Sequence, residues 1–350
     1  MAADARILSE AELNRALLGR QLLLERVKSP LPKVLERMGM LQAQYAPSMY
    51  IGLWARIEAF ERGQLDEALE RRSVAQGTLM RATIHLVSKR DYWPAAIGIR
   101  RGRREAWLKA GPRRGYSASQ MAAHARRLRA RLGGGTMSRK EIHELLGSDS
   151  VVTNGVNHWL DLVRVPPSGT WERRRADLYA ASDQWLGPPP EIDEVDGVEL
   201  LVRRYLGAFG PGAVAEIANW AGLHPTRLAR ALDRLKLRRF AAEDGTELLD
   251  LPRAQLPDPE TSAPPRFLPT WDATLLAHAR RTGILPEEHR PRVFNARTPQ
   301  SVSTFLVDGQ VAGTWRFDKG KVRMQPFGRL DAAARRELRD EAERLAELYR

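Results

Sequence analysis

Hydrophobic and polar positions along the chain repeat one plan three times, with two or three short helices followed by a pair of strands around a turn. The first copy covers about 8–93, the second begins near Tyr116, and the third begins at about Val198. Ser9 and Glu12 have the spacing of a capping box ahead of a run of leucines, which predicts the first helix. A helix–turn–helix followed by a hairpin is the outline of a winged helix, so the pattern predicts three winged helices in tandem.

Three features predict where the strands lie. Alternation of apolar and polar residues over 78–87 predicts one strand in the first copy. A turn over 165–169 predicts a hairpin in the second copy, with its second strand starting at Thr170. Asp244 and Gly245 form a typical hairpin turn in the third copy.

The chain after Pro264 follows a different plan, with a hairpin around Asp308 and Gly309 and a charged C-terminal helix that starts at Asp331. The pattern as a whole predicts an α/β protein of the α+β type. The predicted division of the chain is winged helix 1 over 1–98, a basic connector over 99–115, winged helix 2 over 116–187, a linker over 188–196, winged helix 3 over 197–260, and a hairpin-and-helix region over 261–350 that completes the fold.

Composition narrows the classes of function. Hydrophobic residues make up 43% of the 350 residues, and 56 Lys+Arg against 43 Asp+Glu leave a net charge of +13. This charge favours a polyanionic partner, either nucleic acid or an acidic membrane surface. Cysteine is absent, which excludes disulfides, thiolate zinc sites and cysteine nucleophiles. No stretch reaches the ~18 apolar residues of a membrane span and the N-terminus lacks a signal-peptide core, so we expect a cytoplasmic protein without membrane contact.

Clustered basic residues are candidates for contact with phosphates. The alternative is a solvated basic face in an arginine-rich protein. One cluster lies in the connector and the other lies on the predicted recognition helix of the third copy. Their members are Arg100, Arg101, Arg103, Arg104, Lys109, Arg113 and Arg114 in the first cluster, and Arg227 and Arg230 in the second.

Gln42 and Gln44 are the first candidates for chemistry. In an extended backbone they point to the same side, while Ala43 between them turns into the core. Two amides can hold and orient a water molecule against a sugar carbon, but glutamine is no strong base. The pair therefore suits a reaction whose leaving group is already activated. A purely structural role for two glutamines near a helix end is the alternative.

A second polar row alternates with apolar residues and is expected to line the surface of the predicted strand. It consists of Arg81, Thr83 and His85. In this hypothesis Arg81 meets a phosphate and His85 donates to a phosphate or tunes the water, with a structural histidine as the alternative. His143 lacks the second histidine of a helical zinc motif, and Asp272 is expected to cap the helix that follows it. We expect neither a metal nor a cofactor.

Five segments, taken in their order along the chain, resemble the AlkZ/YcaQ family of winged-helix DNA glycosylases. They are 41–44 (LQAQ), 77–87, 204–211, 268–272 and 307–315. The resemblance implies three tandem winged helices around a basic concave surface that takes duplex DNA, with a Q-x-Q catalytic motif on Gln42 and Gln44. The second glutamine places the sequence with the AlkZ-like branch. Members of that branch remove bulky N7-alkylated purines, and some protect producers of DNA-alkylating antibiotics from their own product.

The chemistry implied by this resemblance agrees with the residue types. N7-alkylguanine carries a positive charge, so its glycosidic bond is already weakened and the enzyme has to position a water near C1′ and stabilise an oxocarbenium-like sugar. We expect Gln44 to orient the water and Gln42 to support it or contact the sugar–phosphate. No lysine stands near the motif, which predicts hydrolysis without strand cleavage. The expected partner is double-stranded DNA with an alkylated purine, bound by a monomer.

A non-enzymatic winged-helix transcriptional regulator is the alternative function. It explains the charge and the helix–turn–helix repeats equally well, but it gives no role to two co-facing glutamines. An RNA-binding or nuclease role lacks support, because aromatic residues are only 7% of the chain and no acidic cluster suggests two-metal chemistry.

Overall fold

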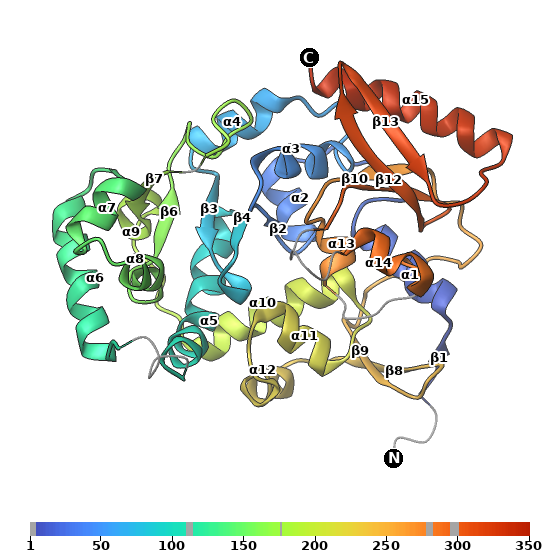
Figure 1. Cartoon of the computed structure of the whole chain (residues 1–350). Coiled ribbons are helices and arrows are strands. Elements are labelled where there is room, and N and C mark those ends of the chain that lie inside the picture. The colour runs from blue at the N-terminus through green and yellow to red at the C-terminus, as the bar shows by residue number, and fades with distance from the viewer. Residues whose placement is uncertain (1–4, 110–114, 176, 278–282, 295–300) are drawn as a thin grey trace.

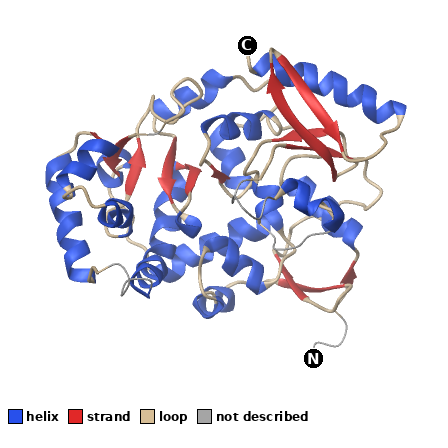
Figure 2. Ribbon diagram, viewed as in Figure 1, coloured by secondary structure: helices blue, strands red, loops and turns tan. Residues whose placement is uncertain are grey.

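The computed structural model describes residues 5–109, 115–175, 177–277, 283–294 and 301–350 (Figure 1). These residues form a mixed fold of helices and strands, in which helices surround sheets of six, four and three strands (Figure 2). The expected α+β class is therefore confirmed.

The six-stranded sheet joins the first two copies of the sequence pattern. The strand order is β2-β4-β3-β6-β7-β5. Their bounds are β2 (Leu41–Gln42), β3 (Val74–Thr78), β4 (Ile84–Ser88), β5 (Met137–Ser138), β6 (Leu162–Arg164) and β7 (Leu178–Ala181). β3 pairs antiparallel with β6, and Gly77 lies opposite Val163. The hairpins of the two copies therefore share one backbone ladder.

The first copy contains four helices and a hairpin. The sequence pattern predicted one continuous strand in place of this hairpin. The helices are α1 (Glu10–Arg20), α2 (Leu31–Arg37), α3 (Ala46–Trp54) and α4 (Arg62–Glu70). The predicted capping box at Ser9 and Glu12 is present. The predicted single strand over 78–87 is wrong, because a 3₁₀ turn over Met80–Ala82 splits it into β3 and β4. Arg81 and Ala82 take left-handed φ angles of 51° and 56° in this turn without a glycine to signal it.

The segment predicted as a basic connector is mostly helical. The 21-residue helix α5 (Lys89–Lys109) begins at the end of β4 and ends before the second copy begins. Trp107 near its C-terminal end belongs to the same buried cluster as Met121 and Leu128. Helix α5 therefore contributes side chains to the hydrophobic cores of both the first and the second copy.

The second copy has the predicted helices and a hairpin with a shorter second strand. Its helices are α6 (Ala118–Leu132), α7 (Arg139–Leu145), α8 (Ser150–Gly155) and α9 (Ser182–Leu186). Gly133 ends α6 with a φ of 50°, and Ser138 caps α7. The second strand of the hairpin starts at Leu178 instead of Thr170, because the residues between them form an extended loop.

The third copy contains three helices and a hairpin, and the hairpin forms a three-stranded sheet with a strand from the start of the chain. Its elements are α10 (Glu194–Phe209), α11 (Val214–Ala221), α12 (Ala229–Arg234), β8 (Arg238–Ala242) and β9 (Glu247–Asp250), and β1 (Ile7–Leu8) pairs in parallel with β8. Helix α10 starts inside the predicted linker, since Asp193 caps it and the acidic residues form its first turn. A Cβ on Gly98 of α5 would lie 2.6 Å from the Gly197 carbonyl carbon, so these glycines let α5 and α10 pack closely.

The C-terminal region packs a four-stranded sheet against a long helix. The elements are β10 (Arg266–Leu268), α13 (Ala273–Leu276), α14 (Arg290–Val293), β11 (Thr304–Val307), β12 (Gln310–Asp318), β13 (Lys321–Pro326) and α15 (Ala332–Leu348). The predicted hairpin at Asp308 and the helix start at Asp331 are confirmed. Asp272 caps α13 as predicted, and it also forms a buried ion pair of 2.9 Å with Arg56, which ties this region to the end of α3.

Candidate functional site

The two glutamines of the Q-x-Q motif lie at the edge of the six-stranded sheet and contact each other. Gln42 of β2 is opposite His85 of β4, and its Nε2 donates a hydrogen bond to Gln44 Oε1 at 2.5 Å. Ala43 between them is buried, as expected. Gln42 is 5% exposed whereas Gln44 is largely exposed. The two amides therefore lie on one side, and Gln44 is the member that a substrate can reach.

Arg81 holds the inner glutamine in place. Its Nη2 donates to Gln42 Oε1 at 3.3 Å, and its Nη1 donates to the Trp220 carbonyl near the end of α11 at 2.5 Å. Burial lowers the pKa of the Arg81 guanidinium. The guanidinium therefore makes internal contacts that connect α11 to the motif. The sequence led us to expect a contact with a phosphate instead.

Thr83 and His85 also serve internal contacts. The Thr83 hydroxyl donates to the Met80 carbonyl at 3.0 Å and closes the 3₁₀ turn. His85 is only 3% exposed, so its predicted place on the surface is wrong. It lies on β4 between β2 and β3, and α5 covers this face of the sheet, where Tyr92 lies beside Gly77, the β3 partner of His85. Burial lowers the pKa of His85 to about 3, and its Nδ1 lies 3.0 Å from the Thr83 carbonyl, which requires Nδ1 to carry the proton of a neutral ring.

Three arginines of the predicted connector cluster hold the second copy against α5. Arg103 is buried and donates to the Thr78 carbonyl at 2.5 Å and to the Asn157 carbonyl at 2.6 Å. Arg104 donates to the His158 carbonyl at 2.7 Å, and Arg100 forms an ion pair of 2.7 Å with Asp161. These three residues are therefore packing residues in the structure, in contrast to the surface cluster that the sequence predicted.

The other predicted DNA contacts divide into exposed and paired residues. Lys109 and Arg230 are exposed, and Arg101 is exposed while forming an ion pair of 3.1 Å with Glu105. Arg227 is paired with both Glu105 and Glu194. Arg113 and Arg114 lie outside the described residues.

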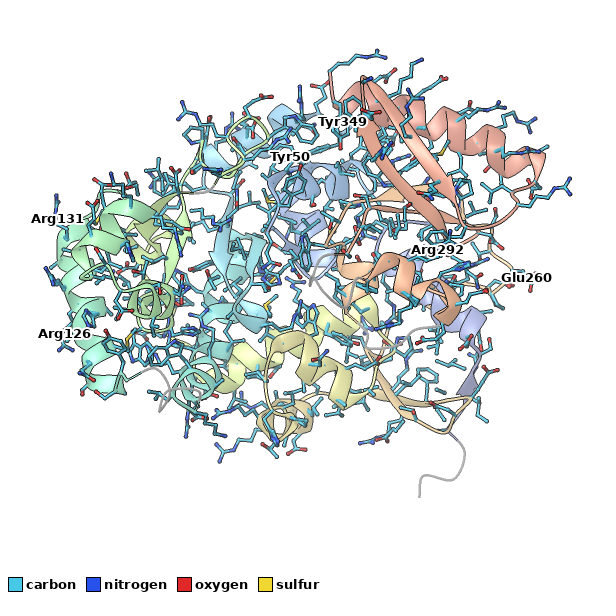
Figure 3. All side chains as sticks on the ribbon, viewed as in Figure 1. Tyr50, Arg126, Arg131, Glu260, Arg292 and Tyr349 are labelled. Carbon is cyan, nitrogen blue, oxygen red and sulfur yellow. The ribbon has the colours of Figure 1, made fainter. Side chains whose placement is uncertain are left out.

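Sequence reasoning missed a basic loop beside the motif. Arg174, between β6 and β7, donates to the Tyr45 hydroxyl at 3.4 Å, and Tyr45 is the residue after Gln44. Residues 173–175 are all arginines, and their side chains are exposed. Trp171 anchors this loop against the ring of Tyr349, with a centroid distance of 5.0 Å. Tyr349, near the C-terminus, is labelled in Figure 3. Three consecutive arginines in a hairpin loop were the signal that identifies it.

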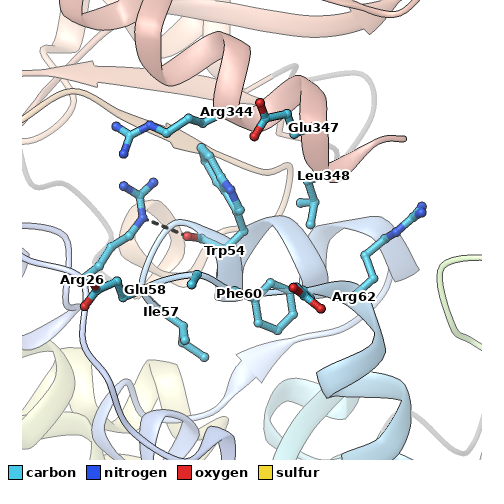
Figure 4. A pocket seen from close by; sticks show the side chains of 11 residues that line it. Arg26, Trp54, Ile57, Glu58, Phe60, Arg62, Arg344, Glu347 and Leu348 are labelled. Atoms are coloured by element: carbon cyan, nitrogen blue, oxygen red, sulfur yellow. Dashed lines mark hydrogen bonds between the residues drawn. The ribbon is translucent and has the colours of Figure 1, made fainter.

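A pocket of about 510 Å³ lies where the end of α3 meets α15 (Figure 4). Arg26 in its wall donates to the Trp54 carbonyl at 3.0 Å and pairs with Glu341. Arg344 pairs with the same glutamate. Because both arginines are engaged in ion pairs and the pocket shares no residue with the glutamine motif, we assign it no part in the site.

The chemistry available at the motif is that of two amides, a fixed guanidinium and a neutral imidazole. Within the described ranges, no group of three or more His, Asp or Glu side chains is placed to hold a metal ion. No helix in the same part of the chain is long and apolar enough to span a membrane. The arrangement can orient a water molecule and donate hydrogen bonds to an oxygen-rich substrate, but it offers no strong base.

Comparison with known proteins identifies chains of the same architecture. A family model described as "DNA glycosylase AlkZ-like" matches residues 35–348. A curated protein of Streptomyces sahachiroi, "Interstrand DNA cross-link repair glycosylase", is 23% identical over 338 residues, with 88% of each chain covered. The solved structure of "Streptomyces sahachiroi DNA glycosylase AlkZ" superposes with a TM-score of 0.82 at 18% identity, and the match covers 98% of this chain and 97% of that one.

Proposed function

Because the chain belongs to the AlkZ-like DNA glycosylase family, we propose that it hydrolyses the bond between a cationic N7-alkylguanine and its sugar in duplex DNA. The observation that carries the proposal is the exposed Gln44, held by the buried Gln42, which is itself held by Arg81. An amide fixed in this way can position water without a large loss of side-chain entropy when the substrate binds.

The roles of the two glutamines follow from their exposure. Gln44 reaches the substrate and orients the attacking water near C1′. Gln42 accepts from Arg81 and donates to Gln44, so it fixes the direction in which the Gln44 amide points. The positively charged base leaves without a strong acid, which suits a site that contains a neutral His85 in place of a protonated one.

We propose that the reaction is monofunctional, with base release but no strand cleavage. β-Elimination proceeds through a Schiff base with an amine. The sequence contains no lysine between Lys33 and Lys89, the range that includes the motif and the β3–β4 hairpin.

The three helix–turn–helix copies are proposed to act as winged helices around one DNA-binding surface. Arg101, Lys109 and Arg230 are its exposed basic candidates, and Arg113 and Arg114 remain candidates from the sequence alone. We further propose that a monomer binds a bulky adduct left by a DNA-alkylating natural product, and that it protects the producing cell. The name of the Streptomyces sahachiroi relative, which refers to interstrand cross-link repair, supports a bulky lesion.

The test is base release from duplex DNA that carries one N7-alkylguanine, detected on a denaturing gel after mild alkali. Gln44→Ala and Gln42→Ala are expected to lower the single-turnover rate about 100-fold or more, comparable to removal of a positioned catalytic donor. Gln310→Ala, an exposed glutamine of β12, is the matched control and should keep the wild-type rate. A covalent DNA adduct trapped by borohydride would contradict monofunctional hydrolysis. Tight DNA binding without base release from any adduct would favour the transcriptional regulator.

A further inference from the structure

A pocket of about 670 Å³ lies where α1, the end of α2 and α10 meet the loop over 251–257. Its volume falls within the range of about 300–1,000 Å³ that small-molecule sites occupy. It shares no lining residue with the glutamine motif. We name it the arginine pocket after the arginines that line it, which are Arg20, Arg37, Arg203, Arg204 and Arg253.

The arginine pocket carries more positive charge than its carboxylates balance. Glu36 is the only carboxylate among the described residues that line it, and cations already surround this group. Lys33 Nζ lies 3.1 Å from the carboxylate, and guanidinium nitrogens of Arg204 and Arg90 approach it to 3.6 Å and 3.7 Å. An anion that enters the pocket therefore meets guanidiniums without a free carboxylate to repel it.

Buried carboxylates fix two of the arginines in the wall of the pocket. Arg20 Nη1 lies 2.7 Å from the buried Asp250, which also pairs with Arg238 at 2.9 Å. Arg204 Nε pairs with the buried Asp91 at 2.5 Å. Because these contacts lie within the protein, they hold the two guanidiniums in place before any ligand binds.

Arg37, Arg203 and Arg253 are the guanidiniums that a ligand can reach. All three are exposed, and they come from the end of α2, from α10 and from the loop. Arg203 pairs with Glu199 of its own helix at 2.7 Å. Neither Arg37 nor Arg253 forms an ion pair within the part of the chain that the structure describes. Converging guanidiniums are typical of phosphate sites, because one guanidinium can donate two parallel hydrogen bonds to phosphate oxygens.

One side of the arginine pocket is apolar. Leu251 and Pro257 of the loop lie opposite two glycines of the helices. A Cβ on Gly207 of α10 would lie 3.7 Å from Leu251 Cδ1, and a Cβ on Gly19 of α1 would lie 3.4 Å from Pro257 Cγ. These four residues have no polar side-chain atom, so this side of the pocket suits an apolar ring.

We propose that the arginine pocket binds a phosphate ester of about nucleotide size. Its phosphate lies at Arg37, Arg203 and Arg253, and its ring packs against Leu251 and Pro257. The phosphate belongs either to a free mononucleotide or to a DNA strand, since the guanidiniums recognise the same group in both. The pocket is separate from the glutamine motif, so this inference does not rest on the proposed base release.

The test measures the binding of AMP and of inorganic phosphate at low salt by phosphorus NMR. Wild type should bind AMP saturably and more tightly than inorganic phosphate. Arg37→Ala and Arg253→Ala should each weaken the binding of both ligands about tenfold or more, since each variant removes charged hydrogen bonds. Arg336→Ala, an exposed arginine of α15 outside the pocket, changes the net charge equally and should leave both affinities unchanged.

Gly207→Met tests the place of the ring separately from that of the phosphate. The added side chain would occupy the apolar side of the pocket, so AMP should bind about fivefold or more weakly while inorganic phosphate binds as in wild type. An unchanged affinity for AMP in this variant would overturn the place given to the ring. Melting temperatures establish that each variant is folded.

Binding of undamaged duplex DNA by the same variants identifies the source of the phosphate. Weaker duplex binding by Arg37→Ala and Arg253→Ala than by Arg336→Ala would assign the pocket to a phosphate of DNA. Equal duplex binding by the three variants would assign it to a free nucleotide. The inference would be overturned if wild type bound neither AMP nor inorganic phosphate saturably, or if Arg336→Ala lost as much affinity as the pocket variants.

Discussion

Each polar group at the motif is fixed by a neighbour that other contacts hold. The Arg81 guanidinium bonds to the Trp220 carbonyl and to Gln42, and Gln42 bonds to Gln44. His85 lies opposite Gln42 on β4 and bonds through Nδ1 to the Thr83 carbonyl. The exposed amide of Gln44 is thus the end of a hydrogen-bonded chain that starts in α11, and removal of an inner member should act on the rate through orientation.

His85 makes the stability of the protein depend on pH in a predictable direction. Its folded-state pKa is about 3, below the ordinary value of 6.5, so the unfolded chain binds more protons in this range. The stabilisation is complete above about pH 6.5 and is lost as pH falls towards 3, by up to about 1.4 kcal/mol per pH unit. In urea unfolding at pH 7, 6 and 5, His85→Gln should therefore show a smaller loss of stability on acidification than wild type.

The exposed His224 provides the control for this experiment. His224→Gln should reproduce the wild-type dependence on pH, whatever its stability at pH 7. Parallel curves for wild type and His85→Gln would show that His85 is not the group whose protonation destabilises the fold.

At the scale of elements, the sequence predicted local structure well where one residue has one clear partner. The capping box at Ser9 is of this kind, as are the helix caps at Asp272 and Asp331. The failures arise where the partner is distant in sequence. The alternation over 78–87 is compatible with one strand, but the turn that divides it contacts α11, which is distant in sequence. Likewise, a count of basic residues does not reveal that Arg103 binds carbonyls of two separate segments.

The candidate site shows the same division. The side-by-side placement of Gln42 and Gln44 follows from a two-residue period that is local to the chain. The burial of His85 depends on β3, β2 and α5 packing around β4, and Tyr92 of α5 lies so close to Gly77, the β3 partner of His85, that a Cβ there would approach its ring to 2.6 Å. No pattern within 78–87 contains this information.

The end of α11 determines where the motif lies, and Gly222 is the residue that allows the contact. It has a φ of 71°, and a Cβ at this position would lie 2.8 Å from the Arg81 backbone nitrogen. Gly222→Ala should therefore displace Arg81 and release Gln42, and we expect at least a tenfold slower single-turnover base release. Gly245→Ala is the matched control, since its φ is 83° and nothing lies within 4 Å of the added Cβ.

Both variants carry the cost of a left-handed alanine, about 1–2 kcal/mol. Gly245→Ala should show this loss of stability with a normal rate of base release. If Gly222→Ala also released the base at the wild-type rate, the contact between α11 and Arg81 would have no part in positioning the motif.

At the scale of the whole molecule, the three copies are joined by contacts that no single copy contains. The six-stranded sheet crosses from the first copy to the second, and buried ion pairs link the first copy to the later parts of the chain. Arg56 and Asp272 form one such pair, and Arg20 and Asp250 form another at 2.7 Å. Many arginines are thus engaged in contacts within the fold. The net charge of +13 is therefore not a measure of how many cationic side chains are free to bind DNA.

The dependence of DNA affinity on salt distinguishes these two uses of arginine. Arg230 is exposed, whereas Arg227 on the same part of the third copy is paired with Glu105 and Glu194. Each phosphate contact contributes about 0.9 to the slope of log K against log salt concentration. Arg230→Ala should therefore lower the magnitude of the slope on undamaged duplex by about 1, whereas Arg227→Ala should lower it by less than half as much. Arg336→Ala, an exposed arginine on α15, changes the net charge equally and should leave the slope unchanged. Equal changes in all three variants would mean that affinity follows net charge, and the third copy would then have no specific place on the duplex.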